Sequence, residues 1–248
     1  MKLFVIILCL FSERFIMHAI SYKRFIWFGD YCKKISHRLH GNKLQSPWVL
    51  FIIFVLPPLI LFSLIYFLFH TIVFGFFGLI LNVLIFYYCL GPQNPFYPIT
   101  AVPDEDQKNA IQTYFAQVNT QLFAVIFWYI FLGPLGLLFY RLCTLCRQID
   151  SVALQANQVS DVLEWIPARM TVLLYLLVGN FQRGFQAFIR FILARPAQNE
   201  GMLGTCGLLA VQASDIQEVS IADAEHLVEH ACFVLLVLIA LFTLMAWV

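Results

Sequence analysis

The sequence predicts an all-α fold: a polytopic helical membrane protein with a kinked or broken central helix and with re-entrant or interfacial helices. Hydrophobic residues make up 61% and charged residues 12% of the 248-residue chain, against about 45–50% and about 25% in soluble domains. Its mean hydropathy is +0.82. Several apolar runs also reach the roughly 20 residues that a helix needs to cross about 30 Å of hydrocarbon. We expect one membrane domain over residues 1–248, with the lipid bilayer as its solvent.

The charges are unevenly distributed along the chain. The net charge of +1 argues against a nucleic-acid partner, which would require a basic surface. Basic residues gather in the first 43 positions and acids in residues 200–230, an orientation signal. It predicts cytoplasmic segments at 22–45, 92–118 and 192–225. The seven cysteines lack the spacing of a disulfide framework, so we expect reduced thiols.

The first half of the chain contains three apolar runs. Residues 3–20 could span the membrane, although Glu13 and Arg14 interrupt the run and each would need its own partner there. Residues 48–69 and 71–91 are long enough to cross and are separated by a short turn. We expect them to form an antiparallel hairpin.

A long helix is expected to follow the Pro-rich stretch that ends at residue 103, because residues 104–106 are acidic and suit a helix N-terminus. Its apolar part, residues 121–142, is the third predicted span. Gly133, Pro134 and Gly136 lie in the middle of that part, where they should bend or break the helix and let a neighbour approach closely.

The last third is harder to assign. Pro167 suits a first helical turn with Asp161 as a cap upstream, and the apolar run at 166–182 is short. We therefore expect an in-plane or partly buried helix there, with a full span as the alternative. Residues 230–247 form the final predicted span, with an aromatic residue at its end.

Three groups of charged residues are candidates for ligand binding, and the first is Glu13 with Arg14. Arg141 either reaches the lipid headgroups beside a packing kink or lines a polar cavity that binds an anion. Asp161, Glu164 and Arg169 either form a local ion-pair cluster or, through Arg169 and Arg141, hold a substrate phosphate. Two further patterns carry weaker signals. His226 and His230 are four residues apart, but metal binding would need ligands from elsewhere, and the C-x-x-C at 143–146 lacks the context of a redox motif.

Several segments together resemble the AmpE family of bacterial inner-membrane proteins. They are "LGP" at 90–92, "VNTQLFAVIFWYIFLGPLGLLFYRL" at 118–142, "LEWIPARM" at 163–170 and "VGNF" at 178–181. The resemblance runs nearly end to end, and its motifs are specific in combination. It implies a multi-pass protein of the bacterial inner membrane with a link to β-lactamase induction, through a neighbouring amidase that recycles cell-wall muropeptides.

AmpE proteins are in turn similar to the CobD/CbiB synthases, which join an aminopropanol moiety to a corrin. The run "G-P-x-G-x-x-x-Y-R" places Arg141 on the synthase arginine, and "IPAR" places Arg169, with Asp161 on one of a pair of aspartates. This chain departs from the synthase pattern at four positions. Thr144 replaces an asparagine and Arg147 an aspartate, while "VNTQL" keeps Asn119 and Thr120 but has Val118 and Leu122 in place of two acids. The early "G-D-P" and "H-P" signature is also missing.

These comparisons lead to three functional hypotheses. The first is an accessory or sensor protein that modulates β-lactamase induction or cell-wall stress signalling without catalysis, with no metal or cofactor, because the lost acids should disable a nucleotide-dependent synthase. It would bind an anionic small molecule, a muropeptide or a nucleotide, near Arg141, Arg169 and Asn119, or another protein of cell-wall recycling. The second is a divergent CobD/CbiB-like ligase, which would use a nucleotide or Mg²⁺. The third is a small anion transporter, although the broken segment is not repeated as inverted-repeat transporters would require.

Overall fold

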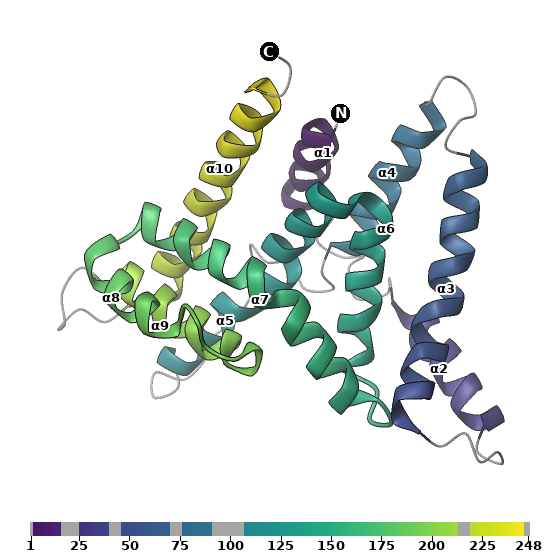
Figure 1. Cartoon of the computed structure of the whole chain (residues 1–248). Helices are drawn as coiled ribbons and strands as arrows, with labels where there is room; N and C mark the ends of the chain where they lie inside the picture. Colours follow the sequence, from purple (N-terminus) through teal and green to yellow (C-terminus); the bar gives the residue numbers. More distant parts are fainter. Residues whose placement is uncertain are drawn as a thin grey trace. The chain divides into compact units, whose positions relative to one another are not determined.

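Helices make up all the regular structure in the part of the chain that the computed structural model describes, which is residues 2–15, 25–39, 46–69, 76–90, 107–212 and 219–245. No strand occurs in these ranges. The all-α prediction is therefore confirmed. In chain order the elements are α1 (Lys2–Phe15), α2 (Ile26–Leu39), α3 (Pro47–Phe69), α4 (Phe76–Cys89), α5 (Gln107–Val118), the π-helix η4 (Asn119–Phe123), α6 (Ala124–Cys146), α7 (Ala153–Val178), α8 (Phe181–Phe191), the 3₁₀-helix η5 (Pro196–Gln198), α9 (Asn199–Val211) and α10 (Ile221–Met245) (Figure 1).

Three helical segments are long and apolar enough to cross a membrane. They are α3, the segment Gln107–Cys146 and α10, and they overlap the predicted spans 48–69, 121–142 and 230–247. Much of the apolar surface of α3 is exposed, including Ile60, Leu64 and Leu68 on successive turns of one face. Apolar side chains turned outward along a whole helix are typical of lipid contact. The chain thus has the architecture of a helical membrane protein.

The other two predicted spans lie partly outside the described residues. Helices α1 and α4 have 14 residues each, about 21 Å of helix, which is shorter than the roughly 30 Å hydrocarbon core. Residues 16–20 and 71–75 are not described, so the spans 3–20 and 71–91 stay predictions. Helix α4 packs against both α1 and α3.

The predicted break in the central helix is confirmed at Gly133. Its dihedral angles are φ 73° and ψ −162°, a region that essentially only glycine occupies. The next residue, Pro134, also disfavours a helical conformation at the position before it. A Cβ on Gly136 would lie 2.1 Å from the Cβ of Leu132, so glycine is needed there for the backbone to fold back across the break.

Helix α7 corrects the expectation for Pro167 and for residues 166–182. It is one helix of 26 residues with Pro167 inside it, about 39 Å long, and not a short in-plane helix that starts at the proline. Proline removes a single backbone donor, and the good helix formers upstream begin the helix at Ala153. Asp161 therefore lies inside α7 and does not cap it.

The chain divides into two compact units. Unit 1 comprises Met1–Pro92 and Val125–Leu163, and unit 2 comprises Gln93–Ala124 and Glu164–Val248. In unit 2, α9 packs against α5 and α8. A Cβ on Gly204 would lie 2.8 Å from the Cβ of Gln112, and one on Gly207 would lie 2.6 Å from the ring of Phe115. The glycines of α9 thus let α5 come close, and residues 192–225, which the sequence predicts as a cytoplasmic segment, contain a helix of the unit 2 core.

Candidate functional site

Arg141 is a buried helix cap in unit 1. Its side chain is 3% exposed, and its Nε donates a hydrogen bond of 2.8 Å to the carbonyl oxygen of Cys89, the last residue of α4. Its guanidinium carbon lies 5.6 Å from the ring centroid of Phe25. A cation at a helix C-terminus stabilises the helix dipole. Arg141 therefore does not reach the headgroups as a snorkelling side chain, and it connects α6 to the end of α4.

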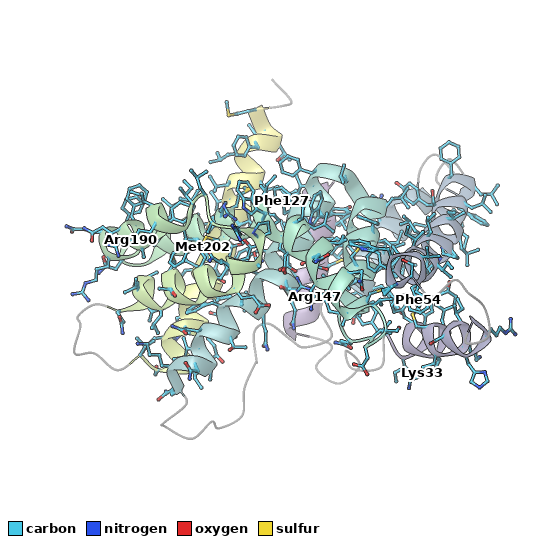
Figure 2. The ribbon with its side chains drawn as sticks, turned by 60° about the horizontal axis from the view of Figure 1, so that its bottom comes forward. Lys33, Phe54, Phe127, Arg147, Arg190 and Met202 are labelled. Atoms are coloured by element: carbon cyan, nitrogen blue, oxygen red, sulfur yellow. The ribbon has the colours of Figure 1, made fainter. Side chains whose placement is uncertain are left out.

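Arg147 and Asp161 form an ion pair within unit 1. The Nη2 of Arg147, which is labelled in Figure 2, donates to the Oδ1 of Asp161 over 2.8 Å. Their side chains are 17% and 26% exposed, so the pair contributes little to stability, about 0–1 kcal/mol. Its chemical consequence is larger, because a carboxylate already neutralised by a guanidinium is a poor ligand for a second cation. Asp161 thus pairs with Arg147, whereas the sequence suggested a local cluster with Glu164 and Arg169.

Arg169 is the centre of a hydrogen-bond network in unit 2. Its side chain is 8% exposed and lies over the ring of Trp165, 3.9 Å from the centroid. A guanidinium has five N–H groups, and the structure gives five bonds: Nε to Ile192, Nη1 to Trp165 and Asn199, and Nη2 to Phe191 and Ala194, over 2.7–3.4 Å.

These acceptors show what Arg169 does in the structure. The carbonyls of residues 191, 192 and 194 belong to the end of α8 and the segment after it, and Asn199 begins α9. Arg169 therefore caps α8 and holds the α8–α9 connection against α7, and every donor already has a protein acceptor. Glu164, in the same unit, is also buried.

Asn119 lies in a second polar cluster of unit 2. It is the first residue of the short π-helix η4, a geometry that often marks functional positions, and it is fully buried. Its Oδ1 accepts a 2.8 Å hydrogen bond from the hydroxyl of Thr171. Tyr175 is one turn further along α7, on the same face, and is also fully buried between the rings of Phe115 and Phe123.

Two polar groups of this cluster lack a partner. Neither the Nδ2 of Asn119 nor the hydroxyl of Tyr175 makes a hydrogen bond to any part of the chain that the structure describes. A buried donor left unsatisfied costs about 1–3 kcal/mol, and such groups usually bind a ligand or an ordered water. Each of these donors could bind an oxygen acceptor, such as a carboxylate, phosphate or carbonyl group.

Unit 1 also contains an open cleft of about 410 Å³ between α2 and the turn after α6. Lys33 and Asp150 line it, together with the aromatic ring of Phe28 and the thiol of Cys32. Burial raises the pKa of Cys32 to about 12. This thiol is therefore a weak nucleophile at neutral pH.

The remaining candidates form neither a metal site nor a disulfide within the described residues. The side chains of Glu13 and Arg14 lie outside them, although both residues belong to α1. The ring of His230 is hydrogen-bonded to the carbonyl oxygen of His226, and no group of three or more potential metal ligands occurs in the described ranges. All seven cysteines are buried and form no disulfide, including Cys143 and Cys146.

Sequence reasoning singled out Arg141, Asn119 and Arg169 but missed their partners. Thr171 and Tyr175 are polar residues four positions apart in an apolar run, and that spacing is the signal that could have found them. The sequence indicates Arg147 only as a departure from the synthase pattern and not as the partner of Asp161. Nothing in the sequence indicates the cleft, because its two sides are more than 100 residues apart.

Comparisons with known proteins support only part of the resemblance. No family model matches the chain, and no solved structure matches it. The cobalamin biosynthesis protein CobD of Chromobacterium violaceum is 31% identical to this chain over 78 residues, which is 27% of this chain and 24% of that protein. The chain thus spans about a quarter of the length of that relative. This similarity supports a coarse likeness to CobD, and the likeness to AmpE stays a prediction.

Proposed function

We propose that this chain is a non-catalytic accessory or sensor protein of the bacterial inner membrane. It would use a helical scaffold similar to that of the CobD/CbiB synthases and act, as its resemblance to AmpE implies, in β-lactamase induction or cell-wall stress signalling. The main observation in favour of a non-catalytic role is the ion pair between Arg147 and Asp161.

The ion pair matters because of the positions it occupies. Arg147 replaces an acid of the synthase pattern, and Asp161 matches a synthase aspartate. A synthase that activates a carboxylate with a nucleotide needs acids that hold a metal ion and its phosphates. Here the remaining acid is neutralised from within the chain. The other two lost acids are Val118 and Leu122, which are buried apolar residues.

The buried donors of Asn119 and Tyr175 support binding of a small molecule that presents an oxygen acceptor. A muropeptide or a nucleotide would meet this requirement through its carboxylates or phosphates. Arg141 stays a candidate for the same role in unit 1. For Arg169 we propose a structural role, because its five donors are bound to protein acceptors.

A divergent synthase is the second candidate, and the similarity to CobD favours it. Under this hypothesis the chain would bind a nucleotide with Mg²⁺ or a corrinoid. The two hypotheses therefore differ in whether a corrinoid, or a nucleotide that requires Mg²⁺, stabilises the folded protein.

A thermal-shift screen in detergent separates them, since a ligand that binds the native state raises the melting temperature as its concentration rises. The ligands are muropeptides, nucleotides and corrinoid precursors, each with and without Mg²⁺. Stabilisation by a muropeptide alone, reduced in Tyr175→Phe, supports the sensor. Stabilisation by Mg²⁺ with a nucleotide, or by a corrinoid, contradicts the absence of synthase chemistry. No response from any class would refute the ligand hypothesis and favour a protein partner.

Two variants at position 147 test whether the ion pair between Arg147 and Asp161 prevents a cation from binding. Arg147→Asp restores an acid beside Asp161, so the two carboxylates should repel each other and Mg²⁺ should raise the melting temperature of the variant more than that of the wild type. Arg147→Ala is the matched control, because it removes the ion pair without adding an acid. Equal responses of both variants to Mg²⁺ would mean that residue 147 does not face a cation site.

A further inference from the structure

We propose that α8 and the segment that follows it lie in the plane of the membrane surface and bind anionic phospholipid. We call this region the interfacial strip. It consists of the apolar residues Phe181, Ile189, Ile192 and Leu193 and the basic residues Arg190 and Arg195.

Helix α8 has a wide apolar face, and the rest of the described chain covers only one stripe of it. Gly184 and Phe188 are buried, and a Cβ on Gly184 would lie 3.5 Å from the carbonyl oxygen of Cys206 on α9. Next to this buried stripe, Phe181, Ile189 and Ile192 share a face by their helical spacing. They are 47%, 54% and 42% exposed, and Leu193 just beyond the helix is 86% exposed. Much of the surface of these four large apolar side chains is therefore left uncovered by the residues that the structure describes.

The polar side of the strip has only positive charge. No Asp or Glu occurs between residues 165 and 199, whereas arginines occur at 183, 190 and 195 within or just after α8. Arg190 and Arg195 are exposed, and neither side chain forms a hydrogen bond or an ion pair with the described residues. Figure 2 shows Arg190 at the outer edge of unit 2, directed away from the ribbon. Bulky apolar residues beside arginines, with no acid, match a bilayer surface that contains anionic lipid.

Contacts within unit 2 place the start of α8 beside the first turns of α10, just before the uncharged part of that helix begins. A Cβ on Gly179, two residues before α8, would lie 2.3 Å from the carbonyl oxygen of Ala210 and 3.0 Å from Cδ1 of Leu227. Leu227 belongs to the polar first turns of α10, and an uncharged run starts at Ala231 and continues to the end of that helix. The start of α8 thus lies close to a membrane–water boundary, where an amphipathic helix is stable.

The test uses the full chain in nanodiscs with an environment-sensitive fluorophore on Leu193→Cys. The seven native cysteines are buried, so the introduced thiol is the accessible one. Brominated acyl chains quench a fluorophore that lies among them, and Gln186→Cys on the polar face of α8 is the matched control. We expect strong quenching at position 193 and weak quenching at position 186. Equal weak quenching at both would overturn the in-plane placement, and a dry but unquenched fluorophore at 193 would identify a protein surface instead.

Lipid preference tests the arginines separately. In mixed bilayers, brominated phosphatidylglycerol should quench the fluorophore at 193 with a preference on the order of 10-fold over brominated phosphatidylcholine, since each arginine near an anionic surface contributes severalfold. The preference should fall to nearly one in Arg190→Gln/Arg195→Gln. It should persist in Lys33→Gln/Lys34→Gln, which removes two exposed cations elsewhere. A preference that survives the first double variant, or that is absent in the wild type, would refute lipid binding by these arginines.

Discussion

Replacing Gly133 by alanine tests the broken helix directly. The residue has φ 73° and ψ −162°, and an added Cβ would meet no atom within 4 Å. The whole effect therefore comes from forcing an L-residue into a backbone region that only glycine occupies readily, which costs about 1–3 kcal/mol. In a protein of this size, 1 kcal/mol corresponds to roughly 2–4 °C. We expect the melting temperature to fall by roughly 2–12 °C.

A second glycine provides the matched control. Gly201 lies in α9, and an added Cβ there would also meet no atom within 4 Å, but its φ is not positive. Gly201→Ala should stabilise the helix by about 0.5–1 kcal/mol, because alanine loses less backbone entropy. Each variant adds one methyl group at a position with no atom nearby, and the two should change the melting temperature in opposite directions.

The assay is thermal unfolding of both variants in one detergent, followed by circular dichroism at 222 nm and by intrinsic fluorescence. A melting temperature of Gly133→Ala at or above that of the wild type would refute the reasoning. It would mean that residue 133 adopts an ordinary helical conformation and that α6 is continuous. A fall in both variants would instead indicate that any added methyl group disturbs these helices.

Three further predictions concern the buried side chains of Arg169, Thr171 and Cys32. Arg169→Leu should lower the free energy of unfolding by at least about 3 kcal/mol, because several buried carbonyls lose their donor. The control Arg190→Gln should change it by less than about 0.5 kcal/mol. Denaturant titration measures both values, and equal effects of the two variants would contradict the capping role of Arg169. Thr171→Val should destabilise by about 1–3 kcal/mol, because the buried Oδ1 of the neighbouring asparagine loses its donor; an unchanged denaturation midpoint would show that the hydrogen bond is dispensable. The thiol of Cys32, with its pKa raised to about 12 by burial, should be on the order of 10⁻⁴ ionised at pH 8, against roughly a quarter for a free thiol. Its alkylation rate, followed by mass spectrometry, should rise about tenfold per pH unit from pH 7 to 10, and a rate that levels off near pH 9 would contradict the shift.

Local patterns predicted those features that depend on local chemistry. The three candidate membrane helices follow from run length and hydropathy, because a span needs about 20 apolar residues whatever its neighbours are. The break at Gly133 follows from a glycine directly before a proline, since each disfavours the helical conformation at that position. Pro167 shows the limit of this reasoning. The same rule predicted a helix start there, but one missing donor did not outweigh the helical preference of the residues on both sides.

The sequence by itself thus determined an apolar, all-helical chain, the place of its central break and the residues most in need of partners. Only the tertiary structure decided which partners they have. Arg141 and Arg169 cap helices that begin or end far along the chain, Asp161 pairs with Arg147, and Asn119 meets Thr171. The physical reason is that a buried charge or amide requires a hydrogen-bond partner. The sequence indicates which residues require one but not which helix provides it. That choice depends on how the helices pack, which no local pattern contains.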